Sequence, residues 1–263
     1  MSELRIFTYL PNPRLWKSTI AARLCGVTIE IRGCSAKDLN RWLWDFDARE
    51  IATGEQETMA RFKRSARKGF RGDLFKTDSF LLAQPFGTVP TAFSPDGQIG
   101  VFESNSIMRA VARLGQDRFP LYGSTPYEAS RIDGFLDVSL IFAQATQAYL
   151  LRPSNDSHAR AKEAFDVYGE GIERALSSGR SFLVENQLSL ADICFVAELA
   201  LFLNEKRRIA DLYHLEPILS ADSEKRFPRL FDHFYTLCQH QAFSPDLAPH
   251  LESLSLSRPR SRG

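Results

Sequence analysis

The sequence predicts an α/β domain followed by an all-α domain. Three observations lead to this prediction: a strand, a helix and a second strand follow one another between residues 5 and 31, a hairpin and a helix follow between residues 91 and 114, and the patterns after residue 126 are helical. A mixed α/β segment that precedes an all-helical segment indicates two separately packed parts. A chain of 263 residues is long enough for both.

The first strand is predicted at residues 5–9, "RIFTY", and the first helix over residues 14–24. Gly26 stands where a helix end favours a left-handed residue. The β-branched run "VTIEI" at 27–31 then predicts the second strand. A strand, a helix and a strand in so short a span indicate a βαβ unit with parallel strands.

A β-hairpin and a helix are predicted further along the chain. "TAF" at 91–93 and "QIGVF" at 98–102 flank "SPDG", which is a turn signal. A helix follows over residues 104–114, because Ile107, Val111 and Leu114 recur at spacings of four and three. Together with the βαβ unit, these elements predict a thioredoxin-like four-stranded sheet.

A long insertion, at about residues 35–83, separates the two halves of this sheet. We expect it to be partly helical, with a helix in "LNRWLWDFDAREI". Its stretch from 54 to 83 is basic, and no acidic residue interrupts the cations between 61 and 71. A solvated helix or loop is the favoured interpretation, and a phosphate-rich partner such as RNA is the alternative. These cations are Arg61, Lys63, Arg64, Arg67, Lys68 and Arg71.

The segment 115–125 is rich in glycine, proline and polar residues and is the predicted domain boundary. The first domain is therefore expected over residues 1–115, an all-helical domain over 126–250, and a disordered tail over 251–263. Pro126 suits the first position of a long helix. Ser189, with Asp192 three residues later, forms a capping-box pattern.

The composition excludes several classes of function. The net charge of +1 creates no field that would favour a nucleic-acid or membrane partner, and we expect neither. The chain contains no apolar run of ~20 residues and no signal-peptide pattern at its N-terminus. Four scattered cysteines fit reduced thiols and a cytoplasmic location. The five histidines show no metal-ligand spacing, so no metal is expected.

Several motifs together resemble the glutathione S-transferases. They are "FGTVPTAF", the turn "SPDG", "VFESNSIMRAVARLG" and "SLADICF", in this order. The N-terminal "FTYLPNPRLWKSTIAARLCGV" is most similar to the transferase-like domain of elongation factor 1B gamma and its bacterial and fungal relatives. The resemblance implies the two-domain glutathione transferase fold, with glutathione as co-substrate.

The resemblance also implies which residues hold glutathione. A cis bond between Val89 and Pro90 would leave the Val89 N–H and C=O free to pair with the cysteinyl backbone. Glu103 would accept a hydrogen bond from the γ-glutamyl ammonium group. Ser104 would hold the γ-glutamyl carboxylate at a helix N-terminus. The alternative for Ser104 is a helix N-cap, and both roles are compatible.

Three residues are candidates for activating the thiol. Tyr9 could donate a hydrogen bond from its hydroxyl to the sulfur, Asn12 could donate one from its amide N–H, and Arg14 could lower the thiol pKa by its charge. Leu10 replaces the serine of serine-using relatives. The alternative is that Tyr9 is a buried strand aromatic and Asn12 a turn former.

The leading hypothesis is a cytoplasmic glutathione transferase that adds the thiolate to a small electrophile and forms a homodimer. The insertion departs from the family, and it could reshape the pocket, cover it or block a dimer surface. The second hypothesis is a non-catalytic binding or scaffold protein related to elongation factor 1B gamma. The chain stops where the additional C-terminal domain of that factor would begin, which argues against the full factor.

Overall fold

The computed structural model describes residues 2–66, 72–177, 179–208 and 215–254. The chain divides into two compact units, Met1–Phe119 and Pro120–Gly263. The division falls inside the glycine- and proline-rich segment 115–125.

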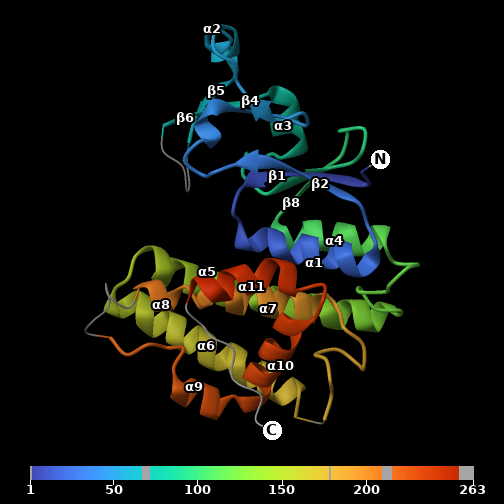
Figure 1. The fold of residues 1–263 in the computed structure, drawn as a ribbon, viewed down its shortest axis with the longest axis vertical. Helices are drawn as coiled ribbons and strands as arrows, with labels where there is room; N and C mark the ends of the chain where they lie inside the picture. The colour runs from blue at the N-terminus through green and yellow to red at the C-terminus, as the bar shows by residue number, and fades with distance from the viewer. Residues whose placement is uncertain (1, 67–71, 178, 209–214, 255–263) are drawn as a thin grey trace. The chain divides into compact units, whose positions relative to one another are not determined.

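The first unit contains two sheets (Figure 1). In chain order its elements are β1 (Leu4–Tyr9), η1 (Pro13–Leu15), α1 (Trp16–Cys25), β2 (Ile29–Cys34), η2 (Leu39–Arg41), β3 (Trp42–Trp44), β4 (Arg49–Glu50), α2 (Gln56–Met59), η3 (Ala60–Phe62), β5 (Lys63–Ser65), β6 (Asp73–Lys76), α3 (Asp78–Ala83), β7 (Thr91–Phe93), β8 (Gly100–Phe102) and α4 (Ser104–Leu114).

The main sheet has the strand order β2-β1-β7-β8, and it confirms the predicted thioredoxin-like arrangement. β1 pairs in parallel with β2 and antiparallel with β7, and β7 pairs antiparallel with β8. Gly26 ends α1 in the left-handed conformation, with φ of 64°, as predicted. α1 and α4 lie side by side on one face of this sheet, and α3 and the inserted residues lie on the other (Figure 1).

The second strand differs from its predicted bounds, because β2 runs to Cys34 instead of ending at residue 31. Pairing with β1 extends it through Arg32 and Gly33, whose polar and flexible character hid the strand. At Gly33 a Cβ atom would lie 1.7 Å from the Thr8 carbonyl oxygen, so the close approach of the two backbones requires glycine.

The predicted helix in "LNRWLWDFDAREI" is wrong. This stretch forms η2, β3 and β4, and the insertion folds into a second sheet with the order β4-β3-β6-β5. Leu43 and Trp44 are both buried although they point to opposite faces of β3. A strand covered on both faces lacks the alternation that distinguishes a strand from a helix.

The basic run is only in part the predicted solvated helix or loop where it is described: Arg61 and Phe62 belong to the 3₁₀ helix η3, and strand β5 follows them. Lys63 and Arg64 lie in strand β5, whose partner is β6. Lys63 pairs with Asp73 and Arg64 with Asp78, each at 3.0 Å, so acidic residues that follow the run 61–71 offset these charges. Arg67, Lys68 and Arg71 lie outside the described residues.

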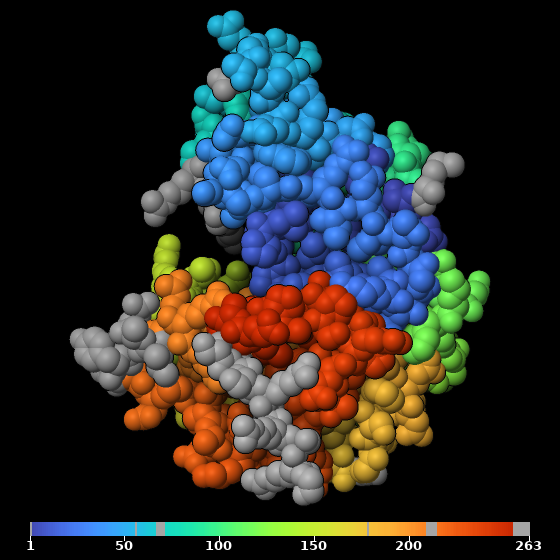
Figure 2. Space-filling model, viewed as in Figure 1, coloured from blue at the N-terminus to red at the C-terminus, as the bar shows by residue number. Residues whose placement is uncertain are grey.

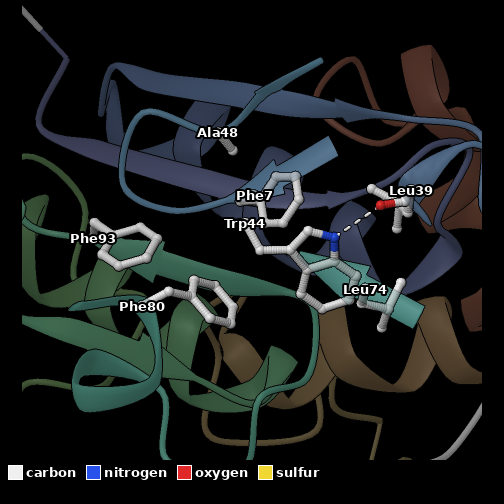
Figure 3. Packing of buried hydrophobic residues seen from close by; sticks show 7 residues of the cluster. All are labelled: Phe7, Leu39, Trp44, Ala48, Leu74, Phe80 and Phe93. Atoms are coloured by element: carbon white, nitrogen blue, oxygen red, sulfur yellow. Dashed lines mark hydrogen bonds between the residues drawn. The ribbon is translucent and has the colours of Figure 1, made fainter. Parts of the chain in front are cut away.

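One aromatic core joins the two sheets of the first unit. Phe7 of β1 and Phe80 of α3 pack edge-on against Trp44 of β3, and the Trp44 indole N–H donates to the Leu39 carbonyl at 3.0 Å (Figure 3). Phe93 of β7 completes this cluster from the main sheet. The insertion is therefore anchored by aromatic packing on the main sheet. In Figure 2 the light-blue residues of the insertion project beyond the dark-blue residues of β1 and α1.

The second unit is helical where it is described. Its helices are α5 (Pro126–Leu151), α6 (Asn155–Ala175), α7 (Leu190–Phe202), α8 (Glu205–Arg208), α9 (Ala221–Arg226), α10 (Pro228–Gln239) and α11 (Ser244–Ser253). No helix in the described ranges is long and apolar enough to cross a membrane.

The capping box that opens α7 is present, as predicted. The Ser189 hydroxyl accepts from the helix backbone, and the buried Asp192 carboxylate accepts from the Ser189 N–H at 2.9 Å. Asp192 also accepts from the Leu183 N–H and contacts His233 Nε2, both at 2.9 Å. The expected tail over 251–263 is wrong at its start, because α11 continues to Ser253, and residues 255–263 lie outside the described residues.

Candidate functional site

The strand register brings the predicted site residues to one edge of the main sheet. Phe7 pairs with Thr91, so Tyr9, two residues after Phe7, and Val89, two residues before Thr91, reach the same edge. Thr91 also pairs with Phe102, which directly precedes Glu103. Neighbouring strands lie about 4.8 Å apart, so the ends of β1, β7 and β8 form a row of about 10 Å.

Tyr9 is half-buried at the end of β1 and packs against the aromatic core. Burial raises the pKa of its hydroxyl, and the positive charge of Arg14 opposes that shift only in part. A raised pKa keeps the phenol protonated at neutral pH. Tyr9 is therefore a hydrogen-bond donor in this setting and carries no charge.

Asn12 is occupied by the local backbone. Its side-chain oxygen accepts from the Arg14 N–H at 3.0 Å, and its amide group donates to the Thr8 hydroxyl at 2.9 Å. It caps the 3₁₀ turn Pro13–Leu15 that leads into α1, and it is buried. These contacts are those of the turn-forming role that the sequence left open for Asn12.

The loop before β7 is held by hydrogen bonds at Thr88 and leaves the Val89 backbone without one among the described residues. The Val89–Pro90 bond is cis, as expected, and so is Leu10–Pro11, which sequence reasoning did not anticipate. The buried Gln84 side chain donates to the Thr88 carbonyl at 3.2 Å, and the Thr91 hydroxyl donates to the same carbonyl at 2.8 Å. Among the described residues, no hydrogen bond occupies the Val89 N–H or C=O.

Glu103 and Ser104 stand where β8 passes into α4. Glu103 is exposed and occupies the N-cap position with φ of 67° and ψ of 130°, a conformation that costs a non-glycine residue free energy. The alternative assignment of Ser104 as the N-cap is wrong, because the helix begins at Ser104 and Glu103 precedes it. In the described part of the chain, the largely buried Ser104 hydroxyl has no hydrogen-bond partner.

The first turn of α4 is electropositive. Its leading N–H groups and the helix dipole favour an anion. In addition, the ammonium group of the fully buried Lys17 donates to the Asn105 side chain at 2.7 Å, one residue from Ser104. Sequence reasoning missed Lys17, because nothing in the local sequence indicated that its side chain would face α4, whose Asn105 lies 88 residues away.

Cys34 is a second residue that sequence reasoning missed. It lies at the end of β2, directly beside Tyr9 in the parallel register. Burial and the carboxylates of Asp38 and Glu50 raise the pKa of its thiol to about 11, against a smaller opposing effect of Arg41. A thiol with this pKa is almost entirely protonated at neutral pH, so Cys34 is a poor nucleophile.

Metal chemistry has no evident site in the parts of the chain that the structure describes, since no three His, Cys, Asp or Glu side chains gather there. All four cysteines are free thiols. The arrangement at the sheet edge is instead suited to a small zwitterionic peptide. It offers a free backbone at Val89, a carboxylate at Glu103, a hydroxyl and N–H groups at Ser104, and a phenol at Tyr9.

Comparison with known sequences finds elongation factor 1-gamma. No protein-family model matches the chain. Elongation factor 1-gamma of Prunus avium is 28% identical over 174 residues, which is 64% of this chain and 38% of that protein. The chain thus spans less than two-fifths of the length of this relative.

Comparison with solved structures finds glutathione transferases. A glutathione transferase from Phanerochaete chrysosporium, solved with oxidized glutathione, has a TM-score of 0.63 and 15% identity, covering 97% of this chain and 98% of that one. A glutathione S-transferase from Methylobacterium radiotolerans, solved with glutathione sulfonate, has a TM-score of 0.60 and 18% identity, covering 93% and 94%. At these identities the likeness concerns the fold.

The raised pKa of Cys34 predicts slow alkylation of this thiol. A shift from 9.0 to about 11 lowers the thiolate fraction at pH 8 about 100-fold. We expect the rate of iodoacetamide labelling at Cys34 to rise about tenfold per pH unit from pH 7 towards pH 10, as measured by peptide mass spectrometry. Cys34→Ser provides the control for site assignment. A labelling midpoint at or below pH 9 would contradict the prediction.

Proposed function

We propose that this protein, which has the fold of the glutathione transferases, binds glutathione across the ends of β1, β7 and β8 and stabilises its thiolate. The observation that carries the proposal is the unoccupied backbone of Val89 between a phenol on β1 and an electropositive helix start after β8. An extended tripeptide is about 10 Å long, which matches the row of strand ends.

In this proposal each part of glutathione has its own partner. The cysteinyl N–H and C=O pair with the Val89 backbone next to Pro90, as an added strand would. The γ-glutamyl ammonium donates to the Glu103 carboxylate. The γ-glutamyl carboxylate accepts from the Ser104 hydroxyl and from the first N–H groups of α4, where the helix dipole and Lys17 add to the attraction.

Tyr9 is the proposed thiol-activating residue. Because its phenol is protonated, it can donate a hydrogen bond to the sulfur, which favours the thiolate over the thiol. The thiol proton passes to solvent, the thiolate attacks an electrophilic carbon and forms a C–S bond, and the bond from that carbon to the leaving group breaks, with its electron pair departing on the leaving group. Arg14 adds positive charge next to Tyr9, whereas Asn12 contributes by holding the loop between them.

The second candidate is a non-catalytic binding or scaffold protein. It is favoured by the sequence similarity to elongation factor 1-gamma over 64% of the chain. Titration of the purified protein with glutathione, followed by thiolate absorbance, separates the two candidates. Saturable thiolate formation supports the transferase, and absence of binding supports the scaffold. In either case four free thiols are in keeping with a reducing compartment, and we propose the cytoplasm.

A homodimer is also part of the proposal, and an exposed face of α5 supports it. Val138 and Ile141 are 45% and 67% exposed, and Gly134 lies one turn before Val138 on the same face. Ala145 continues this face, so it bears apolar side chains over several turns. Exposed apolar faces of this kind are typical of contacts between proteins.

Ser104→Ala is expected to weaken glutathione binding by about 1–3 kcal/mol, because the γ-glutamyl carboxylate loses a hydrogen-bond donor. Isothermal titration calorimetry measures the effect. Ser106→Ala is the matched control, because position 106 points away from position 104 on the helix. Equal affinities of Ser104→Ala and the wild type would rule out the proposed role of Ser104.

Tyr9→Phe is expected to raise the pKa of the bound glutathione thiol by about 1–2 units, since a hydrogen bond to a charged group contributes about 1.5–3 kcal/mol. Ultraviolet difference titration of the thiolate measures this pKa. Asn12→Ala is the comparison variant and is expected to leave the pKa nearly unchanged. If the pKa rises in Asn12→Ala and not in Tyr9→Phe, the assignment to Tyr9 is wrong.

Ile141→Glu is expected to convert the dimer to a monomer, because it places a carboxylate in the apolar face of α5. Light scattering coupled to gel filtration measures the molar mass. Val167→Glu, which alters a similarly exposed aliphatic residue on α6, is the control. A monomeric wild type, or a dimer that survives Ile141→Glu, would exclude this interface.

A further inference from the structure

The inserted sheet makes a direct polar contact with the loop that carries Val89. Lys76 is the last residue of β6, and its ammonium group donates to the Gly87 carbonyl at 2.6 Å. The same ammonium group lies 4.8 Å from the ring centroid of Trp44, on the neighbouring strand β3. Lys76 is only 8% exposed. The contact therefore joins two strands of the insertion to the segment two residues before Val89.

Burying the Lys76 ammonium group costs free energy unless its N–H groups donate hydrogen bonds. The bond to the Gly87 carbonyl is therefore favoured over any arrangement that leaves the ammonium group unpaired. A charged donor forms a stronger hydrogen bond than a neutral one, and the Trp44 ring adds a cation–π attraction. The Gly87 carbonyl consequently has a strongly preferred position relative to β6. Because Gly87 and Val89 are separated by a single residue, the position of one restricts the other.

The backbone conformation of Gly87 and the space around it both favour glycine at the position that Lys76 contacts. Its φ is 60°, in the left-handed region that favours glycine. A Cβ atom at this position would lie 3.1 Å from Lys76 Nζ and 3.2 Å from Leu81 Cδ2. A side chain at position 87 would therefore crowd the ammonium group, and it would also strain the backbone at this φ.

The other hydrogen bonds of the loop come from residues of the thioredoxin-like part of the unit. They also leave the backbone N–H and C=O of Val89 without a partner among the described residues. Gln84 Oε1 accepts from the Phe86 N–H at 2.8 Å, and the Gly87 N–H donates to the Gln84 carbonyl at 2.9 Å. With the bonds to Thr88, they fix the loop on both sides of Val89. Lys76 is the insertion's contribution to this network.

We propose that Lys76 is a positioning residue for the ligand-binding loop. Its bond to the Gly87 carbonyl holds residues 87–90 so that the Val89 backbone faces an extended peptide ligand. The insertion then acts as a support for the glutathione site. That glutathione is the ligand rests on the proposed function. The restraint of the loop by Lys76 is present without any ligand.

The test is Lys76→Met, which keeps the aliphatic chain and removes the charge and the donor. Hydrogen exchange of peptides covering residues 84–91 is expected to become at least about tenfold faster, because the protected Phe86 and Gly87 amides lose their support. The dissociation constant for glutathione is expected to rise about tenfold. Lys63→Met, an exposed lysine of the same inserted sheet, is the control and is expected to change neither quantity.

Gly87→Ala is the second variant, and it keeps the test valid if Lys76→Met fails to fold. It leaves the buried charge in place and displaces the carbonyl, so the same loop peptides are expected to exchange faster. Unchanged exchange of residues 84–91 in both variants would overturn the proposal. So would a loss of affinity in Lys76→Met that disappears at high salt while exchange stays unchanged, because Lys76 would then attract the ligand by charge alone.

The failure of the proposed function is recognised separately. If the wild type binds no glutathione, the proposed ligand is wrong, while faster exchange of residues 84–91 in Lys76→Met still supports the hold on the loop. If the wild type binds glutathione and the exchange is unchanged, the ligand stands and the positioning role is wrong.

Discussion

The register of β1 with its neighbours is the constraint on which the candidate site depends. β1 is an inner strand of the main sheet, parallel to β2 and antiparallel to β7. This pairing places the end of β1, the start of β7 and the end of β8 at one edge. Tyr9, Val89 and Glu103 are far apart in sequence, and the strand spacing alone brings them into a row. A shift of one residue would turn each side chain to the opposite face.

The aromatic core explains how the insertion was added without disturbing that register. Phe7 lies on the face of β1 opposite to α1, where Trp44 and Phe80 pack against it edge-on. Burial of large aromatic side chains contributes strongly to stability, so the inserted sheet shares the core of the main sheet. Its edges are also protected, since Arg64 donates to the Lys63 carbonyl on β5 and Arg49 to the Glu50 carbonyl on β4.

The pKa shifts of Tyr9 and Cys34, which lie side by side at the sheet edge, suit these two side chains to different roles. Burial raises the pKa values of both Tyr9 and Cys34, but the consequences differ. A protonated phenol is a donor that can stabilise a thiolate from outside, whereas a protonated thiol is a weak nucleophile. Tyr9 therefore fits the proposed activation of a bound thiol better than Cys34 fits the role of a nucleophile. In the proposed function, the positive start of α4 receives the γ-glutamyl carboxylate.

The sequence by itself determined the thioredoxin-like sheet, the α4 bounds, the left-handed Gly26 and the capping box of α7. Each of these follows from local periodicity, a turn signal or a cap, which depend on residues close together in the chain. Only the tertiary structure decided that the insertion is a sheet, that Asn12 is a turn cap, and that Lys76, Lys17 and Cys34 adjoin the site. The reason is physical: Leu43 and Trp44 are buried on opposite faces of β3, with Phe7 and Phe80 from distant segments packed on Trp44, and the partners of Lys76 and Lys17 lie 11 and 88 residues away. No local pattern records such contacts, because packing and strand register create them.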